Sequence, residues 1–308
     1  MDVETEKAEK AIGVRPASKG LAMRVPGTPL VLLGRLLRVR LAGPGLAIAV
    51  GLIFLAAAAD VISPYDPYHQ NYGAVLQAPS PSHPMGTDDL GRDVLSRVIH
   101  GSRISLLVGL VSVGLAILAG VTIGFVAGYW SGWLDEVLMR VIDAVWSFPA
   151  LLLALAITAA LGQSIGNAMI AIGIVFTPAF ARLVRAQTLS VREMDFVQAA
   201  RVMGATPTRL MLRHIWPNVT SPVIVQASLY VSFAIITEAS LSFLGVGVRP
   251  PTAAWGSMLR AGYRYLNTAF WLPFFPGVAI FVAVLGLNLL GDGLRVVLDP
   301  RLRVRGEG

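Results

Sequence analysis

The chain has 308 residues, of which 55% are hydrophobic and only 14% are charged, and its formal net charge is +7. Soluble globular domains carry about 25% charged residues, so this composition favours a protein embedded in a lipid bilayer. The chain contains no cysteine, which excludes disulfides, thiolate metal sites and cysteine nucleophiles within it. The positive charge does not by itself indicate nucleic-acid binding, because in a membrane protein the placement of basic residues matters more than their number.

The amino-terminal region predicts a tail, a surface helix and a first span. Residues 1–27 are polar and mixed in charge, which is typical of a disordered cytoplasmic tail without a removable signal peptide. Residues 28–40 alternate leucines with arginines, and this pattern predicts an interfacial helix at the lipid headgroups. The region 41–103 then comprises a first span, about 41–61, and a polar outer loop.

Five further spans are expected within a core over 104–294. A helix needs about 20 apolar residues to cross a hydrocarbon layer of about 30 Å. The apolar runs that meet this requirement are 104–134, 144–181, which has room for two spans, 222–244 and 272–294. The sequence therefore predicts an all-α integral membrane protein with six transmembrane helices.

Charged and turn residues set the expected boundaries of these spans. The second span should end near Tyr129-Trp130, an aromatic pair suited to the membrane interface, and Asp135 and Glu136 should mark a short loop. The third and fourth spans should be joined by the turn 161–167, and Arg182 and Arg185 should end the fourth. Residues 295–308 form a second cytoplasmic tail.

Basic residues are distributed very unevenly between the two sides of this topology. With the amino terminus in the cytoplasm, nineteen of the 25 lysines and arginines fall on the inside and six on the outside. The positive-inside rule applies to loops of this length, so the pattern predicts a multi-pass protein with both termini cytoplasmic.

The inside loop 183–221, between the fourth and fifth spans, is expected to form two short helices. Residues 192–203 favour the first helix. The signals that bound the pair are Gly204 as a stop, Thr206 and Pro207 at the start of the second helix, and Pro217 at its end. Small residues near the bend would let another protein approach the backbone, and the nearby arginines would favour an acidic partner. On residue chemistry alone, an ordinary basic loop beside lipid headgroups explains the segment equally well.

This loop resembles the EAA loop of permease subunits in bacterial ABC importers. The resemblance rests on the pair Ala199-Ala200, then Gly204, then nine residues, then His214-Ile215-Trp216-Pro217-Asn218. It implies a coupling helix that sits in a cleft of an ATP-hydrolysing subunit and passes its closure to the spanning helices. The coupling residues implied are Gln198, Ala199, Ala200, Gly204, Ala205, His214 and Pro217. Gln198 stands where the family usually has glutamate, and Trp216 where leucine is common.

A second match narrows the resemblance to the second permease of dipeptide and oligopeptide importers. It lies in HPMGTDDLGRDVLSRVIHGSRIS at 83–105, with further agreement at 237–248, 255–259 and 290–303. The outer-loop motif comprises Gly86, Asp88, Gly91, Arg92 and Asp93. Arg92, flanked by Asp89 and Asp93, is expected to brace this loop against the second span, because charge-assisted hydrogen bonds can hold a flexible segment.

The resemblance implies a complete transporter in the bacterial cytoplasmic (inner) membrane. The implied partners are a second homologous permease, two ATP-binding subunits, an extracytoplasmic substrate-binding protein and membrane lipid, with no role for nucleic acid. ATP and Mg would be bound by the partner subunits, because the only lysines here, Lys7, Lys10 and Lys19, lie in no P-loop. The chain is therefore expected to bind no cofactor and to be no enzyme. The cargo implied is di- or oligopeptides, with a nickel chelate or glutathione as alternatives.

Two other chemistries fit the sequence less well. Residues 162–166 satisfy the G-x-S-x-G pattern of a hydrolase, but a nucleophile elbow needs a strand before Ser164, and this segment joins two membrane helices. His69 and His83 could meet in the outer loop and hold a metal, although a solvated loop is the stronger interpretation. No catalytic or metal-binding residue is therefore assigned.

Two carboxylates lie within predicted spans. Asp143 and Glu238 are candidates for lining the translocation path, because an ionised side chain in the membrane usually faces a partner or a wet cavity. A packing role near a helix end is an equal alternative, since Asp143 lies close to Arg140 in the sequence. A secondary transporter using these carboxylates would be a rival function, but it would be expected to show an internal repeat, and none is visible.

Overall fold

The computed structural model describes residues 34, 36–37, 39 and 42–298. Within this part the regular secondary structure is helical, with one isolated β-bridge between Thr87 and Asp93 and no strand. The helical elements are α3 Ala42–Ala57, α4 Ala59–Ile62, the 3₁₀ turn η1 Tyr72–Ala74, α5 Val94–Trp130, α6 Trp133–Trp146, α7 Ala150–Leu161, α8 Ile165–Arg192, α9 Asp195–Val202, α10 Pro207–Arg209, the π-helix η2 Leu210–Ile215, α11 Trp216–Leu244, α12 Trp255–Tyr263 and α13 Trp271–Leu298.

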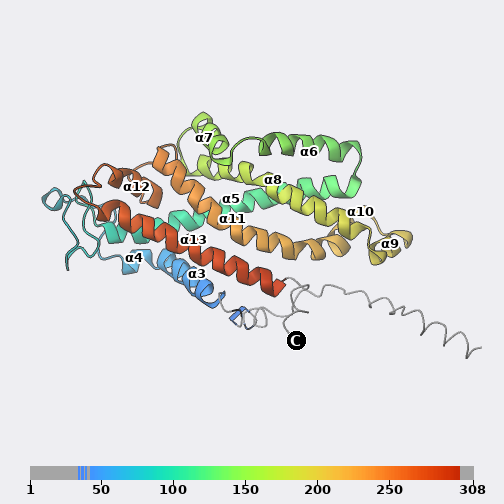
Figure 1. Cartoon of the computed structure of the whole chain (residues 1–308), viewed down its shortest axis with the longest axis horizontal. Coiled ribbons are helices and arrows are strands. Elements are labelled where there is room, and N and C mark those ends of the chain that lie inside the picture. Colours follow the sequence, from blue (N-terminus) through green and yellow to red (C-terminus); the bar gives the residue numbers. More distant parts are fainter. Residues whose placement is uncertain (1–33, 35, 38, 40–41, 299–308) are drawn as a thin grey trace, which may run out of the picture.

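The long helices α5, α8, α11 and α13 form an elongated bundle (Figure 1). The outer segment 62–93 and α12 lie at one end of this bundle, and α9 and α10 lie at the other (Figure 1). We refer to these as the α12 end and the α9 end. The two segments that the sequence singles out, 83–105 and 183–221, therefore belong to opposite ends of the molecule.

The closest helix pair, α5 and α8, meets along a stripe of small residues. Gly120, Gly124 and Gly128 recur every fourth residue on α5, and a Cβ atom built on Gly124 would lie 2.6 Å from the Ala181 carbonyl oxygen. A Cβ on Gly120 would lie 2.6 Å from the Phe180 Cβ atom. Glycine at this spacing lets two helix backbones approach within a membrane, where apolar burial alone gives little driving force.

The helix that contains the second expected span is longer than the span itself. α5 begins at Val94 rather than near 104, because the Asp93 side chain caps it by accepting a hydrogen bond from the Ser96 N–H at 2.8 Å. The helix ends at Trp130, at the expected aromatic pair. The loop expected at Asp135 and Glu136 is wrong, since both residues occupy the first turn of α6, where acidic side chains favour the positive end of the helix dipole.

The apolar run after α6 holds a broken helix and then α8. α6 and α7 are bent by 91° at Ser147-Phe148-Pro149, so they are either one broken span or a re-entrant pair. The expected turn before the next span is present, since α7 ends at Leu161 and α8 begins at Ile165. The bend was not predicted, although the residue before a proline disfavours helical geometry.

The helix that contains the fourth expected span does not end at Arg182 and Arg185, because α8 continues to Arg192. Both arginines find carboxylate partners on α6 within the bundle. Arg182 donates to Asp143 at 2.6 Å, and Arg185 donates through two nitrogens to Asp135, the longer hydrogen bond being 2.7 Å. Charge therefore does not end the helix here, since each guanidinium is paired where it lies.

Within the loop 183–221, the first helix is as expected and the second is not. α9 spans Asp195–Val202 and ends at Gly204, as the sequence predicts. Pro217 was expected to end the second helix, but the chain runs from Pro207 to Leu244 as one helix. The intervening π-turn explains this, because it shifts the hydrogen-bond register and places Pro217 in the first turn of α11, where no N–H is needed.

In the described part of the chain, four helices are long and apolar enough to cross a membrane, or up to five if α6 and α7 form one span. α3 is apolar but has only 16 residues. The predicted interfacial helix 28–40 and the tails 1–27 and 295–308 lie wholly or mostly outside the described residues, although Arg295 is in α13.

Candidate functional sites at the two ends of the bundle

The α9 end carries an exposed surface that combines apolar and basic side chains. Val202, Met203 and Leu212 are exposed by 88%, 81% and 63%. Arg201, Arg209 and Arg213 are exposed among them. Large apolar side chains that remain this exposed at the tip of a bundle are typical of a protein-binding surface. We call these six residues, together with the bend at Gly204, the tip surface.

Beneath the tip surface, the helix pair has a well-defined backbone. Gly204 has φ +83°. The N–H of Gly204 donates to the Arg201 carbonyl at 3.0 Å and that of Ala205 to the Ala200 carbonyl at 3.1 Å, which together form a Schellman motif. A Cβ built on Gly204 would have no neighbour within 4 Å. Glycine is therefore required here by the backbone angle, and the space next to it is open to a partner.

The remaining residues of the coupling motif anchor the pair to the bundle. Ala200 is buried, whereas Ala199 is exposed, so the small residues face both ways. Gln198 Nε2 donates to the Arg192 carbonyl at 3.0 Å and to Glu193 Oε2 at 3.3 Å. A glutamate at this position could accept hydrogen bonds but could make neither of these donations.

The His-Ile-Trp-Pro-Asn segment forms the junction with α11. Asn218 Nδ2 donates to the His214 carbonyl at 2.7 Å, which satisfies an acceptor near the position where Pro217 has no N–H. The Ile215 side chain is fully buried, and Trp216 packs on Phe125 of α5 with ring centroids 5.6 Å apart. The motif thus connects the helix pair at the α9 end rigidly to the long helices α11 and α5.

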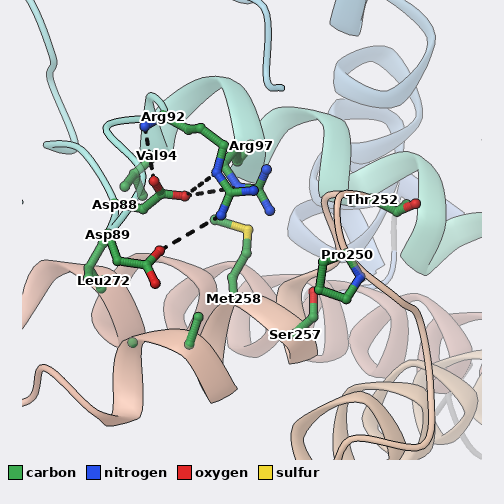
Figure 2. Close-up of a pocket in the computed structure, with 12 residues that line it drawn as sticks. Asp88, Asp89, Arg92, Val94, Arg97, Pro250, Thr252, Ser257, Met258 and Leu272 are labelled. Carbon is green, nitrogen blue, oxygen red and sulfur yellow. Dashed lines mark hydrogen bonds and ion pairs between the residues drawn. The ribbon is translucent and has the colours of Figure 1, made fainter. Parts of the chain in front are cut away.

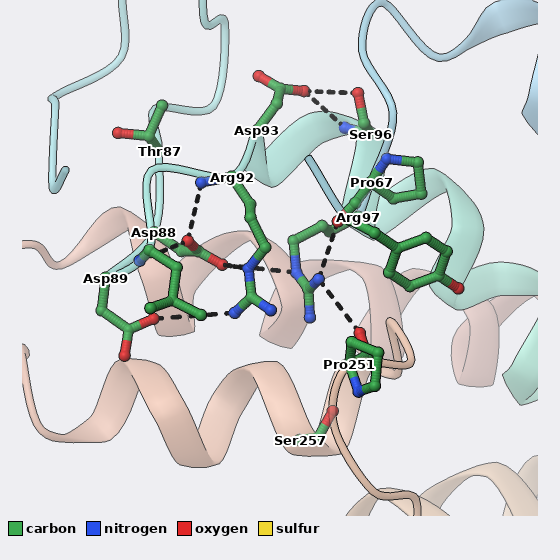
Figure 3. Close-up of polar contacts among 12 residues, drawn as sticks. Pro67, Thr87, Asp88, Asp89, Arg92, Asp93, Ser96, Arg97, Pro251 and Ser257 are labelled. Atoms are coloured by element: carbon green, nitrogen blue, oxygen red, sulfur yellow. Dashed lines mark hydrogen bonds and ion pairs between the residues drawn. The ribbon is translucent and has the colours of Figure 1, made fainter. Parts of the chain in front are cut away.

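At the α12 end, the outer-loop motif is organised around Asp88 (Figure 3). Its Oδ1 accepts from the backbone N–H groups of Leu90 and Arg92, both at 2.9 Å. Its Oδ2 accepts from Arg92 Nε at 2.7 Å and lies 3.6 Å from Arg97 Nε. Asp88, Arg92 and Arg97 are all buried, so the negative charge of Asp88 is needed to offset the desolvation of the two guanidinium groups, and they in turn offset its own.

Asp89 and Asp93, which flank Arg92 in the sequence, are not its main partners. Asp89 lies 3.8 Å from an Arg92 nitrogen, a weaker contact, and Asp93 binds other groups. One Asp93 oxygen caps α5, and the other lies 2.9 Å from His83 Nδ1. Asp93 therefore fixes the start of the helix, while Asp88 fixes the turn before it. The motif glycines, Gly86 and Gly91, lie within this turn, at φ +74° and +71°.

Arg97 was not singled out from the sequence, although it holds three segments together. Its Nη1 donates to the Pro67 carbonyl at 2.9 Å and to the Pro251 carbonyl at 3.4 Å, while its Nε faces Asp88 (Figure 3). The side chain thus links the loop after α4, the motif and the loop after α11. No local pattern identifies it, because two of its partners are backbone carbonyls far away in the sequence.

A small cavity of about 60 Å³ lies beside this cluster (Figure 2). Arg92, Arg97 and Asp88 line one side of it, and Pro250, Thr252 and Met258 contribute to the rest. This volume is sufficient for one or two water molecules and too small for a peptide. A wider hollow of about 410 Å³ lies between α7, α11, α12 and α13, and its lining is apolar except for Ser240.

The two carboxylates that lie within predicted spans occupy different environments. Asp143 does not contact Arg140, which lies 3.7 Å from Glu136 instead, and it is paired with Arg182. Glu238 is fully buried in α11, where its Oε1 accepts from the Ser242 hydroxyl at 2.7 Å. Ser242 Oγ in turn accepts from the Val248 N–H at 3.0 Å, so Glu238 supports the turn after α11.

The remaining sequence candidates have local structural roles. Ser164 caps α8, its Oγ accepting from the Asn167 N–H at 3.1 Å, and it follows a helix rather than a strand. His83 stacks on Tyr65 with ring centroids 4.8 Å apart, beside its contact with Asp93. The described residues contain no group of three or more metal-ligating side chains.

Two family models match the chain. Residues 120–304 match the family model of the inner membrane component of binding-protein-dependent transport systems. Residues 32–79 match that of the N-terminal transmembrane domain of oligopeptide transport permease C. Both families describe permease subunits, and together the two matches include most of the chain.

Several curated relatives are similar over most of their length. The dipeptide transport system permease of Alkalihalophilus pseudofirmus is 43% identical over 264 residues, covering 86% of this chain and 87% of the relative. The di/tripeptide transport system permease of Pseudomonas aeruginosa is 44% identical, covering 84% and 88%. The glutathione transport system permease of Pectobacterium atrosepticum is 43% identical, covering 83% and 87%.

The fold is also found among solved structures. A chain of the methionine ABC transporter MetNI, in an inward-facing conformation, superposes with a TM-score of 0.55 at 17% identity, covering 66% of this chain and 97% of that one. At this identity the likeness concerns the fold alone. Together with the family matches, it confirms the resemblance seen in the sequence: the chain belongs to the family of inner membrane permease components of binding-protein-dependent ABC importers.

Proposed function

We propose that this permease carries di- and oligopeptides across the bacterial inner membrane, as a non-catalytic subunit driven by separate ATPase subunits. The relatives named for dipeptide, di/tripeptide and glutathione transport support a peptide cargo, and glutathione is itself a tripeptide. The proposed assembly contains a second permease, two ATP-binding subunits that hold ATP and Mg, and a substrate-binding protein. The chain itself binds no cofactor in this proposal.

The proposed topology has six spans, formed by α3 with α4, by α5, by α6 with α7, and by α8, α11 and α13. The unequal distribution of lysine and arginine supports placing the α9 end in the cytoplasm. The α12 end, with the Asp88 cluster, then faces outward and meets the substrate-binding protein. The bend between α6 and α7 is accommodated by protein or water around it, since irregular backbone is not tolerated against lipid.

The observation that carries the proposal is the tip surface. Its apolar side chains are largely exposed, its arginines suit an acidic cleft, and the Gly204 bend leaves space for another backbone. Because Ile215 and Trp216 fix the pair to the long helices, a movement imposed on the tip surface is transmitted to α11 and α5. This is the geometry that coupling to ATP hydrolysis requires.

The test is to substitute Gly204 in the complete transporter. We expect Gly204→Trp to leave the isolated permease folded, because its side chain would extend into open space. ATPase subunit retention or hydrolysis stimulated by loaded binding protein should fall by about tenfold or more, which corresponds to a loss of at least 1.4 kcal/mol. Gly204→Asn is the matched control, since asparagine tolerates left-handed backbone angles and is much smaller.

Three measurements separate the outcomes: subunit retention after purification, stimulated ATP hydrolysis and peptide uptake in proteoliposomes. Normal values of all three for Gly204→Trp would contradict the coupling role. Equal losses for Gly204→Trp and Gly204→Asn would assign the effect to the backbone angle instead of to contact with a partner. Uptake of a nickel chelate but not of peptides by the unaltered complex would contradict the proposed peptide cargo.

A further inference from the structure

Arg192, the last residue of α8, also holds the end of α5. Its Nη1 donates to the carbonyl oxygens of Gly128 and Tyr129, at 2.9 and 3.2 Å, and to the Ser131 hydroxyl. These carbonyls belong to the last turn of α5, where carbonyls have no partner within the helix and the helix dipole attracts a cation. The Arg192 side chain is exposed by only 23%, so these contacts are largely shielded from water.

The turn between α5 and α6 needs such support. Ser131 has φ +51°, and Gly132 follows at φ +69°. A left-handed backbone angle is unfavourable for a residue with a Cβ atom, and it persists only where the surrounding structure holds it. The hydrogen bond from Arg192 to the Ser131 hydroxyl supplies such a hold. Arg192 therefore fixes the turn from which α6 starts, at Trp133.

On its other side, Arg192 is bound to the segment that leads into α9. Its Nε donates to Glu193 Oε1 at 2.8 Å. Gln198, on α9, donates through Nε2 to the Arg192 carbonyl at 3.0 Å and to Glu193 Oε2 at 3.3 Å. Gln198, Glu193 and Arg192 thus form one hydrogen-bonded chain from α9, across the end of α8, to the turn between α5 and α6. We call these three residues the Arg192 link.

The Arg192 link is separate from the attachment through Ile215 and Trp216. That attachment leaves the helix pair on its far side, after α10, and reaches α11 and the Phe125 ring of α5. The Arg192 link leaves the pair before α9 and reaches the last turn of α5 and the start of α6. A rigid element that is held at one place can pivot about it, whereas an element held at two places carries both neighbours with it.

Resting on the proposed function, we propose that Arg192 is a positioning residue for coupling: it makes the turn between α5 and α6 follow the movement that the ATPase subunits impose on α9. Arg192 contacts no cargo in this role. Gln198 and Glu193 act through Arg192, because they hold its carbonyl and its guanidinium against α9. The amide of Gln198 is required, since a glutamate there would donate no hydrogen bond and would place a second carboxylate beside Glu193.

The first test compares Arg192→Gln with Arg192→Lys in the complete transporter. We expect Arg192→Gln to keep its ATPase subunits and its stimulated ATP hydrolysis, while peptide uptake per ATP hydrolysed falls by about tenfold, the size expected for the loss of a charged hydrogen bond. Lysine keeps a cation at the end of α5 but lacks the fork that also reaches Glu193, so its loss should be smaller. Arg140→Gln, at an exposed arginine of α6, is the matched control and should transport at the unaltered rate.

The second test measures the movement itself. Because the chain has no cysteine, Trp133→Cys at the start of α6 and Ser190→Cys near the end of α8 give two exposed positions for spin labels. With Arg192 present, we expect the distance between the labels to be the same in the nucleotide-free and ATP-trapped transporter. In Arg192→Gln the distance distribution should shift or broaden when ATP is trapped. A distribution that Arg192→Gln leaves unchanged would overturn the proposal.

The third test concerns the contact between Gln198 and Glu193. We expect Gln198→Glu to lower uptake per ATP by about threefold, because it removes a neutral hydrogen bond. The double variant Gln198→Glu/Glu193→Gln exchanges donor and acceptor between the two positions and should recover most of this loss. Both variants carry the same glutamate on α9, so any direct effect of that glutamate on the ATPase subunits is equal in the two. Equal losses in both variants would exclude Gln198 from the Arg192 link.

The failure of the Arg192 link and the failure of the proposed function give different results. Normal uptake per ATP in Arg192→Gln, with coupling lost in Gly204→Trp, overturns the link alone. A loss of ATPase subunits or of thermal stability in Arg192→Gln that accounts for its lower uptake also overturns the link, because Arg192 would then only support the fold. Normal coupling in Gly204→Trp, or an unaltered complex that transports no peptide, contradicts the proposed function instead.

Discussion

Asp88 accepts hydrogen bonds from two backbone N–H groups and from Arg92, and it also faces Arg97. Four acidic or basic residues lie within six positions of the motif, so the sequence alone allows several pairings. The turn between Asp88 and Arg92 decides among them, because it aims the Asp88 carboxylate back at both the backbone and the Arg92 side chain. Asp93 is committed to the helix cap and is not available for Arg92.

We predict that Asp88→Ala destabilises the permease more than Arg92→Ala does. Removing Asp88 leaves two buried guanidinium groups without their shared carboxylate, and breaking a buried ion pair in this way costs about 3–5 kcal/mol. Removing Arg92 leaves Asp88 with Arg97 and its backbone donors, so the cost should be smaller. Thermal unfolding of the purified permease in detergent measures the order of the two variants.

Asp89→Ala is the control for this pair of substitutions. Asp89 is more exposed and lies 3.8 Å from Arg92, so its loss should cost no more than about 1 kcal/mol. A larger loss of stability for Arg92→Ala than for Asp88→Ala would indicate that Arg92, rather than Asp88, is the centre of the cluster. A change in which peptide is transported, with unfolding unaffected, would indicate that the cluster contacts cargo.

At the scale of elements, the pairing of α5 with α8 depends on closeness that only glycine permits. The stripe at Gly120, Gly124 and Gly128 faces α8, whereas Gly114 on the same helix has no atom within 4 Å of a Cβ built on it. The residue type alone does not distinguish the packed glycines from Gly114. Only the packed glycines recur at a spacing of four residues. The stripe also positions Arg185 and Arg192 of α8 beside α6 and the end of α5, since these lie further along the same interface.

We predict that Gly124→Ala destabilises the permease and that Gly114→Ala does not. The added methyl at position 124 would lie 2.6 Å from the Ala181 carbonyl oxygen, so the helices must separate, at a cost of about 1–3 kcal/mol. At position 114 the methyl meets open space, and alanine should raise helix stability by up to about 1 kcal/mol. Unfolding in mixed detergent micelles compares the two variants, and equal effects would contradict the role given to the stripe.

The elements that the sequence predicts well are those whose signals are local. Apolar runs indicate α5, α8, α11 and α13, and the glycine at 204 marks the end of α9. The errors have a common cause, since they arise where a tertiary contact overrides a local signal. α8 extends past Arg182 and Arg185 because carboxylates of α6 pair with both arginines. The helix extends past Pro217 because the π-turn removes the need for a hydrogen bond from the N–H that proline lacks. Arg97 was missed because two of its partners are distant carbonyls.

At the scale of the whole molecule, function depends on which end of the bundle faces the cytoplasm. The tip surface and the Asp88 cluster lie at opposite ends (Figure 1), so the orientation assigns one to the ATPase subunits and the other to the binding protein. The basic residues of the α9 end support its proposed cytoplasmic placement, and both proposed assignments depend on this placement. A reversed orientation would therefore contradict the proposed coupling and docking surfaces together.

We predict that the α12 end is accessible from outside the cell and that the α9 end is not. Because the chain has no native cysteine, Ser82→Cys and Asn267→Cys at the α12 end and Ser190→Cys and Thr208→Cys at the α9 end each give one reporter at an exposed position. An impermeant maleimide applied to spheroplasts should label the first two, and should label the last two only after the membrane is opened by detergent. All four should react in detergent, which controls for local burial. Labelling of Thr208→Cys in intact spheroplasts would overturn the orientation, and with it the placement of the tip surface against the ATPase subunits.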